Sequence, residues 1–205
     1  MAIESEIKFM LEQGVYATLI QWAHRTGAFI GAAEQTNHYF DTPSHTFADN
    51  KVMLRIRSKS GGRWIMAYKR RLERGDPGQH SVEIEADLDE ALAKSLIKSP
   101  SGILEMEVEP VRALRQDVER LGAVMAGYCQ VGMMVTDRTR IKSPSGLYII
   151  ELDRSSYCGV EDYELECEGE DTAAAELEMV ELLNGLGVSH AGAASPKFAR
   201  LLEAC

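Results

Sequence analysis

Glu4, Glu6 and Lys8 alternate with apolar residues at the very start of the chain. On a β-strand, successive side chains point to opposite faces, so these three charged groups would share one face while the apolar ones cover a core. Carboxylate oxygens are ligands for hard divalent cations, and an ammonium group binds anionic oxygens. Two adjacent carboxylates repel by about 1 kcal/mol even in water, so this face needs solvent, a cross-strand cation or a bound metal.

The same charged alternation returns in later segments, and each segment has mainly one sign of charge. The cationic segments contain Arg55, Arg57 and Lys59, then Lys69, and further on Arg138 and Arg140. The acidic segments contain Glu83 and Glu85, then Glu151 and Asp153, and finally Glu164, Glu166 and Glu168. A solvated sheet face usually mixes both signs, whereas rows of one sign repel unless strands of opposite sign or a ligand face them. The pattern predicts a closed barrel with a charged interior and a small charged ligand.

These strands need further elements that close the barrel and cover its apolar outer face. We expect an α+β fold in which a closed eight-stranded antiparallel β-barrel forms a tunnel, with helices packed outside. Apolar residues at helical spacing predict helices over 11–28, 89–98, 111–121 and 172–186, and a short helix after Pro196. Clusters of Gly, Pro, Ser and Asp predict loops at 42–51, 60–62, 73–79 and 143–146. None of these loops has the features of an interdomain linker, so we expect a single domain over residues 1–205.

Composition and charge limit the classes of function. With 205 residues, of which 45% are hydrophobic, the chain can bury a sizeable core. No run approaches the roughly 20 apolar residues that span a bilayer, and the N-terminus lacks a signal-peptide pattern, so we expect a cytoplasmic protein. The net charge of -10 disfavours binding to nucleic acid or to anionic membranes. A homodimer is expected only from the general frequency of such assemblies.

Several other reactive or charged residues are expected to lie outside the site. Cys129, Cys158, Cys167 and Cys205 are widely spaced without a CxxC pair, so we expect four free thiols and no zinc cluster. Charged residues near predicted strand ends are expected to face solvent, namely Lys59, Arg70, Arg71 and Lys142.

Short motifs along the chain resemble those of a known family. Residues 3–8, IESEIK, resemble the ExExK signature of the CYTH domain, which belongs to the triphosphate tunnel metalloenzyme superfamily. Further motifs are similar in the same order, namely 39–43 (YFDTP), 54–57 (LRIR), 64–69, Glu83 with Glu85, Arg138 with Arg140, Asp153, 163–168 and 195–197 (SPK). This superfamily includes inorganic triphosphatases, thiamine triphosphatase, class IV adenylyl cyclases and fungal RNA triphosphatases. The resemblance extends over nearly the whole chain.

The resemblance implies a metal-dependent enzyme that acts on a triphosphate inside the tunnel. A triphosphate carries roughly four negative charges near neutral pH, so its hydrolysis needs cations around it. The implied ligands of Mg²⁺ or Mn²⁺ are Glu4, Glu6, Glu164 and Glu166, and Glu168 could replace one of them. The implied substrate-binding set is Lys8, Arg55, Arg57, Lys69, Glu83, Glu85, Arg138, Arg140 and Lys197. The implied catalytic set is Glu4, Glu6, Lys8, Asp153 and Glu166, with Asp153 orienting a metal-bound water or a cationic side chain.

Three functions are compatible with these residues. The first is hydrolysis of inorganic tripolyphosphate, or of a small organic triphosphate such as thiamine triphosphate or a nucleotide, with release of phosphate. The second is a class IV-type adenylyl cyclase, which would need a pocket that aligns the ribose hydroxyl of ATP, and no residue pattern marks such a pocket. The third is a noncatalytic module that binds polyphosphate or a nucleotide, which would gain little from the metal-side carboxylates. A long RNA substrate is disfavoured because the acidic chain lacks an evident basic track.

Overall fold

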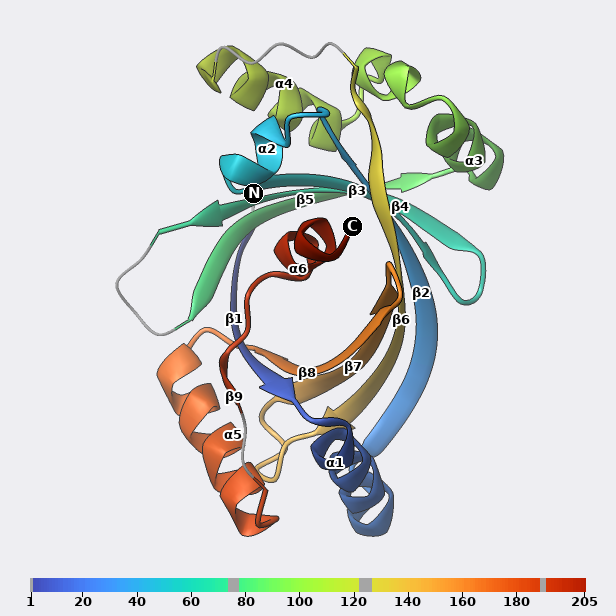
Figure 1. The fold of residues 1–205 in the computed structure, drawn as a ribbon. Helices are drawn as coiled ribbons and strands as arrows, with labels where there is room; N and C mark the ends of the chain where they lie inside the picture. The colour runs from blue at the N-terminus through green and yellow to red at the C-terminus, as the bar shows by residue number, and fades with distance from the viewer. Residues whose placement is uncertain (1, 74–77, 122–126, 189–190) are drawn as a thin grey trace.

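The strands form one closed antiparallel barrel in a computed structural model that describes residues 2–73, 78–121, 127–188 and 191–205. The barrel strands are β1 (Ala2–Leu11), β2 (Phe29–Asp41), β3 (Val52–Lys59), β4 (Arg63–Leu72), β5 (Gln79–Leu88), β6 (Cys129–Lys142), β7 (Ile149–Tyr157) and β8 (Val160–Glu168). Their order around the sheet is β5-β4-β3-β2-β6-β7-β8-β1, and β1 also pairs with β5. The eight-stranded barrel expected from the sequence is therefore confirmed (Figure 1).

The register of β1 closes the barrel and sets which side chains point inward. On one edge Ile3 lies opposite Val82 of β5, and on the other edge Lys8 lies opposite Glu166 of β8. Alternate residues such as Ile7 and Phe9 are buried in an apolar cluster outside the sheet. The period-two pattern of the first residues thus places charge inside the barrel and apolar side chains outside it.

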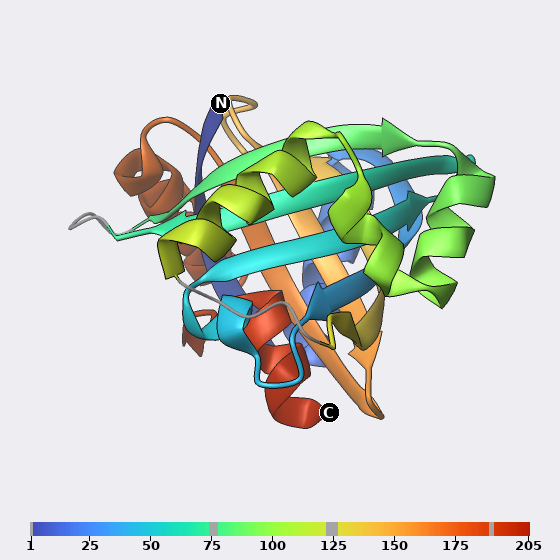
Figure 2. The ribbon, with the colours of Figure 1, turned by 90° about the horizontal axis from the view of Figure 1, so that it is seen from above.

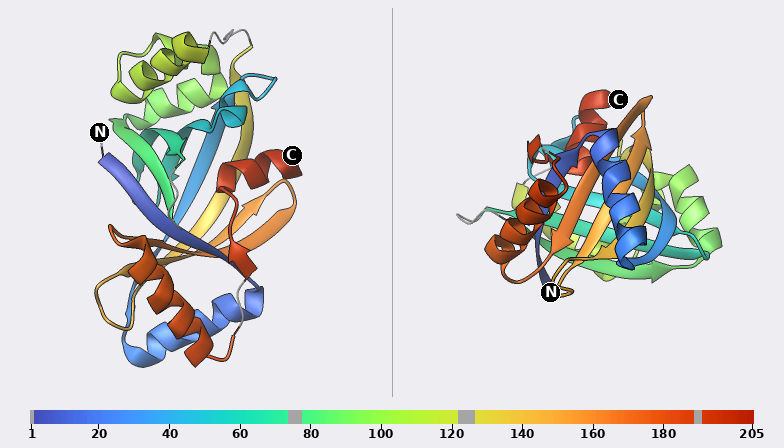
Figure 3. Two further views of the ribbon diagram at one scale, coloured as in Figure 1. Left: turned by 90° about the vertical axis from the view of Figure 1, so that its left-hand side faces the viewer. Right: turned by 90° about the horizontal axis from the view of Figure 1, so that it is seen from below.

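Helices cover the outside of the barrel in two groups on opposite sides (Figures 2 and 3). The helices α1 (Gln13–Thr26) and α5 (Thr172–Gly185) cover β1, β7 and β8, and their apolar cluster includes Leu19, Cys167 and Met179. The second group consists of α3 (Glu90–Lys98), the 3-10 helix η1 (Pro100–Glu105) and α4 (Glu109–Leu121), which pack on β3 and β4. In the described ranges, none of the helices has the length and apolar character needed to cross a membrane.

Local signals explain most of the helix boundaries. Gly27 ends α1 in the left-handed conformation, with φ of 73°. The side chain of Asp89 accepts hydrogen bonds from the amides of Ala91 and Leu92 and caps α3. Thr172 begins α5, and the capping side chain is its predecessor Asp171.

Two of the expected loops contain regular structure or lie partly outside the described residues. The short helix α2 (Thr46–Asp49) forms within 42–51 because the buried carboxylate of Asp41 accepts hydrogen bonds from the amides of Thr42, Phe47 and Ala48. The expected loop at 73–79 lies mostly outside the described residues, and β5 begins at Gln79. The remaining two loops, 60–62 and 143–146, contain the turns that join β3 to β4 and β6 to β7.

The last helix lies across one opening of the barrel and is not part of the outer layer. The short strand β9 (Ala191–Ala193) pairs with β1, and α6 (Lys197–Ala204) follows it into the centre of the ring (Figure 1). Phe198 stacks on Tyr39 with ring centroids 5.0 Å apart, and Leu201 is fully buried. A side chain at Gly132 of β6 would lie 2.3 Å from Leu201, so this glycine permits the close approach of α6.

The expectation of four free thiols is wrong for two of the cysteines. Cys158, in the turn between β7 and β8, forms a disulfide with Cys205 at the end of α6, and their Cα atoms are 5.5 Å apart. The two residues are 47 positions apart in sequence, and the fold brings them together because the turn and α6 meet at the same barrel opening. Cys129 and Cys167 are free, as expected.

Candidate active site

A cavity of about 460 Å³ occupies the interior of the barrel. Among the described residues, the lining includes nine Lys and Arg side chains, namely Lys8, Lys51, Arg55, Arg57, Lys59, Lys69, Arg71, Arg138 and Lys197. It also includes seven carboxylates, namely Glu4, Glu6, Glu83, Glu85, Glu151, Glu166 and Glu168. In a protein with a net charge of -10, this is a strong local concentration of cations.

The two signs of charge occupy opposite halves of the barrel wall. The neighbouring strands β4, β3, β2 and β6 form what we call the cationic arc, which carries the lining arginines and two of the lysines. The neighbouring strands β7, β8, β1 and β5 form the acidic arc, which carries all seven lining glutamates and one cation, Lys8. A ligand inside the barrel would therefore contact a cationic wall on one side and an acidic wall on the other.

Ion pairs join the two arcs where they meet. At one seam Arg138 of β6 lies opposite Asp153 of β7 and donates two hydrogen bonds to its carboxylate, at 2.7 and 2.6 Å. At the other seam Lys69 of β4 lies opposite Glu83 of β5 and also contacts Glu4 at 2.8 Å. These contacts fix the registers of the charged rows relative to each other.

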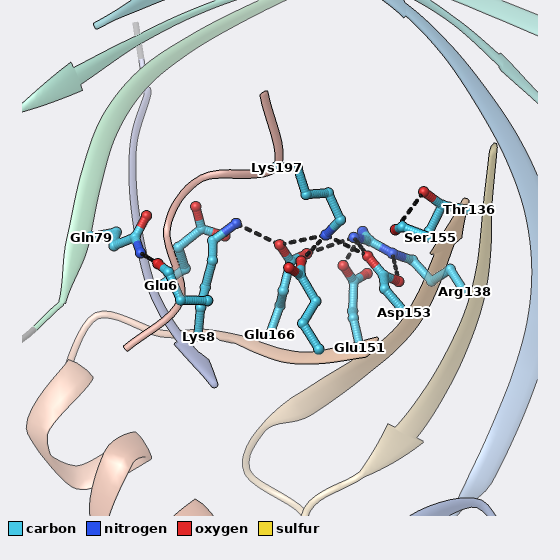
Figure 4. Close-up of polar contacts among 12 residues, drawn as sticks. Glu6, Lys8, Gln79, Thr136, Arg138, Glu151, Asp153, Ser155, Glu166 and Lys197 are labelled. Atoms are coloured by element: carbon cyan, nitrogen blue, oxygen red, sulfur yellow. Dashed lines mark hydrogen bonds and ion pairs between the residues drawn. The ribbon is translucent and has the colours of Figure 1, made fainter. Parts of the chain in front are cut away.

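Three buried carboxylates of the acidic arc converge with a lysine from α6. Figure 4 shows two of them, Asp153 and Glu166, beside Lys197. Oxygens of Asp153, Glu164 and Glu166 lie within 4.8 Å of one another. The ammonium of Lys197 lies 2.7 Å from Asp153 and 2.9 Å from Glu166, and it also contacts Glu164. Burial opposes ionisation of Asp153, but Lys197 and Arg138 outweigh it and lower the pKa of that carboxyl.

Glu164, like Asp153, is enclosed away from the cavity lining. It is fully buried and is held by Lys197 and also by Arg200 of α6. Arg200 additionally donates a hydrogen bond to Asp162 at 2.8 Å. These contacts place Glu164 between two basic side chains of α6, and Glu164 is not part of the cavity lining.

A second group of carboxylates lies toward the β1–β5 seam. Lys69 is 2.8 Å from Glu4, 3.2 Å from Glu6 and 3.4 Å from Glu83. Burial and a hydrogen bond to Glu83 raise the pKa of Glu4 to about 7. Arg55 and Lys69 outweigh burial at Glu83 and lower its pKa to about 2. One carboxylate of this group is therefore only partly ionised near neutral pH, mainly because burial disfavours its charged form.

The acidic arc provides a donor set that fits a hard divalent cation. Its ligand atoms are carboxylate oxygens, which Mg²⁺ and Mn²⁺ prefer. Glu168 lines the cavity, and in the described part of the chain no Lys or Arg lies within ion-pair distance of it. Burial, Glu151 and Glu6 all raise its pKa. The residues that could hold the cation are the lining carboxylates Glu4, Glu6 and Glu168 and the buried cluster of Asp153, Glu164 and Glu166, where a positive charge would relieve this repulsion.

Arg57 is a buried arginine of the cationic arc that has no carboxylate partner among the described residues. Burial and the neighbouring Arg55 and Arg138 lower the pKa of Arg57 to about 10. No carboxylate of the described residues lies within 4.0 Å of its guanidinium, whereas Arg55 is paired with Glu83 at 3.0 Å. A buried cation without a counter-ion is costly, and a phosphate is a ligand that would compensate it.

The structure brings most of the sequence-predicted site residues to the cavity. In the lining are Glu4, Glu6, Lys8, Arg55, Arg57, Lys69, Glu83, Glu85, Arg138, Glu166 and Lys197. Asp153 and Glu164 are buried next to it. Arg140 is placed differently, because its side chain is 53% exposed and lines a smaller pocket of about 340 Å³ at the end of the barrel.

Sequence reasoning missed several residues of the cavity. Lys59 and Arg71, which we expected to face solvent, line it, and their parity with Arg57 and Lys69 could have indicated this. Lys51 also lines the cavity, and Arg200 contacts the buried carboxylates, but neither lies on a barrel strand. No periodicity in the sequence signals such positions.

The fold and the site together define a closed barrel whose interior cavity has a cationic wall and an acidic wall. The chain belongs to the CYTH domain family, whose model matches residues 2–195. This confirms the resemblance seen in the sequence motifs.

Individual relatives agree with this family. The chain is 27% identical over 169 residues to "Putative triphosphatase YjbK" of Bacillus subtilis, covering 82% of this chain and 78% of the relative. Its fold is similar to that of HpAC1 from Hippeastrum, described as an adenylyl cyclase with a dominant triphosphatase activity, with a TM-score of 0.83, 23% identity and coverage of 98% and 95%. A structure from Bacillus halodurans described as "a putative adenylate cyclase" matches with a TM-score of 0.75, 26% identity and 98% coverage of both chains.

Proposed function

We propose that this protein is a metal-dependent triphosphatase that hydrolyses inorganic tripolyphosphate, or a small organic triphosphate, and releases phosphate. The observation that carries the proposal is the division of the cavity wall into a cationic and an acidic arc. A pure anion-binding module needs only the cations, because additional carboxylates would repel its ligand. Both walls together suit a substrate that arrives with a divalent cation.

The residues that line the cavity would have different roles in catalysis. Arg57 would bind phosphate oxygens directly, and Arg55 and Arg138, whose guanidinium groups are paired with carboxylates, would complete the cationic wall that orients the chain of phosphates. Lys8, which is almost buried between Glu6 and Glu166, would orient those carboxylates and add positive charge near the reacting phosphoryl group. When bound, the divalent cation supplies Lewis-acid chemistry that offsets charge on the transferring phosphoryl group.

Asp153 has a supporting role in this proposal. It is fully buried between Arg138 and Lys197, and it contacts both through its carboxylate oxygens. Its charge would hold the two cations in place. It is therefore assigned to orient cationic side chains, which is one of the two roles that the family resemblance implied.

A class IV-type adenylyl cyclase is the alternative, since the Bacillus halodurans structure is described by that activity. Such an enzyme must hold a nucleoside so that its ribose hydroxyl reaches the α-phosphate. Among the described lining residues, the Phe, Tyr and Trp side chains are limited to Tyr39 and Phe198. These two rings stack on each other and are buried. They offer little exposed ring surface for a base, which favours the hydrolase.

Several finer properties are part of the same proposal. We infer Mg²⁺ or Mn²⁺ as the cation, a cytoplasmic location, and one functional domain over residues 1–205. A small triphosphate is the proposed partner, with no nucleic acid or membrane, and a homodimer is the proposed assembly. The charge of -10 supports the exclusion of nucleic acid.

Initial rates of phosphate release from tripolyphosphate, thiamine triphosphate and ATP test the proposal. Each substrate is incubated with Mg²⁺, with Mn²⁺ and with a chelator. We expect phosphate release that requires the metal, with the highest kcat/KM for one of the triphosphates. Formation of cyclic AMP from ATP would support the cyclase instead, and binding of triphosphate without turnover would support the noncatalytic module.

A further inference from the structure

The strand at the middle of the cationic arc carries no lining charge. The residues of β2 that line the cavity are Gln35, Asn37 and Tyr39, and all three are buried. The adjacent strand β3 carries Arg55, Arg57 and Lys59, and the strand on the other side, β6, carries Arg138. A neutral row between two cationic rows reduces repulsion, and it also provides hydrogen-bond acceptors that carry no net charge.

One of these neutral residues directly contacts the arginine that lacks a counter-ion. Asn37 lies opposite Arg57 in the β2–β3 register, and its side-chain Oδ1 accepts a hydrogen bond from Nε of Arg57 at 2.8 Å. Asn37 is 2% exposed and Arg57 is 9% exposed. A buried hydrogen bond of this kind fixes the rotamer of both side chains.

Arg138 shows what a carboxylate partner does at the same kind of position. Its guanidinium is in contact with Asp153, Glu151 and Glu166. Those three carboxylates orient Arg138 but also cancel its charge. Among the described residues, the side chain of Arg57 makes one side-chain hydrogen bond, to Asn37. This bond uses the Nε donor of Arg57 alone. The two terminal nitrogens of Arg57 therefore keep their donors for another ligand.

We propose that Asn37 is a positioning residue of the phosphate site, which aims the guanidinium of Arg57 through an uncharged acceptor and so preserves its full charge and its terminal donors for a phosphate. This inference rests on the proposed function for the identity of the anion. The proposed role requires an amide at position 37. A carboxylate there would neutralise Arg57 through a charge-assisted pair.

The test is the binding of tripolyphosphate in metal-free buffer, measured by titration calorimetry on Asn37→Ala and Asn37→Asp. We expect Asn37→Ala to weaken binding by about fivefold and Asn37→Asp by about 30-fold or more, since one loses orientation and the other also loses charge. His38→Ala is the matched control, because His38 is the next residue of β2, is absent from the cavity lining and should leave the affinity unchanged.

A double-mutant cycle separates positioning from a general structural effect. In an Arg57→Ala background, Asn37→Ala should change the affinity less than about twofold, because Asn37 acts through Arg57. Equal losses in both backgrounds, or an Asn37→Asp protein that binds as tightly as the wild type, would overturn the inference. If Asn37→Ala does not fold, Asn37→Ser takes its place in the cycle with the same expected result.

The outcome is separable from that of the proposed function. A wild-type protein that binds tripolyphosphate but does not hydrolyse it would overturn the triphosphatase, while the cycle would still support or overturn the role of Asn37. Hydrolysis by the wild type together with additive effects in the cycle would support the triphosphatase and overturn the role of Asn37.

Discussion

The ammonium nitrogen of Lys197 lies 2.7 Å from Oδ2 of Asp153, so the last helix contributes a cation to the interior of the barrel. Asp153 is fully buried and Lys197 is 12% exposed. Removing one member of such an ion pair by mutation leaves the other charge buried without compensation, which is strongly destabilising.

Lys197→Met should therefore lower the free energy of unfolding by about 3 kcal/mol. Chemical denaturation in the absence of ligand measures this. The control is Lys94→Met, which removes an exposed ion pair with Glu90 on α3 and should cost less than about 0.5 kcal/mol. Equal stabilities of the two variants would mean that Lys197 does not compensate the acidic arc.

Glu6→Gln should abolish metal-dependent turnover while the protein stays folded. Glu6 is 5% exposed, lies between Lys8 and Lys69, and belongs to the proposed metal ligands. The substitution keeps the shape of the side chain but removes a charge, so we expect kcat to fall by about 100-fold or more. Activity assays and thermal melting measure the two effects. Glu161→Gln, at an exposed position of the neighbouring acidic strand β8, is the control, and a similar loss in both would contradict the metal role of Glu6.

The strand pattern of the barrel could be predicted from the sequence because it depends on local alternation. Parity alone placed Glu4, Glu6 and Arg57 inside and Ile7 outside. Parity does not, however, measure depth along the barrel axis. It therefore could not distinguish Glu164, which Lys197 and Arg200 enclose, from Glu168, which lines the cavity.

The contacts made by α6 could not be predicted from patterns in the sequence. Its amphipathic spacing predicts a short helix after Pro196 but not the opening of the barrel in which it lies. Arg200 and the disulfide between Cys158 and Cys205 both follow from that docking. Arg140 illustrates the converse, since it has the parity of Arg138 but lies near the strand end, where its side chain is half exposed.

Removal of the disulfide should loosen α6. The bond joins residues 47 positions apart and ties α6 to the β7–β8 turn. We expect Cys205→Ser to lower the free energy of unfolding by about 2–4 kcal/mol, because the cross-link restricts the unfolded chain. Alkylation and mass spectrometry of the denatured, unreduced wild type should label two of the four cysteines, and Cys129→Ser is the control for loss of a free thiol. Labelling of all four thiols would show that the bond does not form.

Metal affinity should depend on pH through Glu4. Burial and the hydrogen bond to Glu83 raise the pKa of Glu4 to about 7, and a metal ligand must be deprotonated. Protons therefore compete with the metal increasingly as the pH falls below 7. We expect the affinity for Mn²⁺ to drop by about tenfold between pH 8 and pH 6, because the deprotonated fraction of one group with a pKa of about 7 falls by that factor. Titration calorimetry measures this, and the dependence should largely disappear in Glu4→Gln. Equal affinities of the wild type at both pH values would exclude Glu4 as a ligand.

Phosphorus NMR of the products formed from tripolyphosphate tests the central claim most directly. The purified protein is incubated with tripolyphosphate and Mg²⁺ or Mn²⁺, and in parallel with a chelator and with ATP. We expect the tripolyphosphate signals to be replaced by those of orthophosphate and pyrophosphate, and we expect the chelator to prevent this. Unchanged tripolyphosphate in the presence of metal, or the appearance of cyclic AMP and pyrophosphate from ATP, would contradict it.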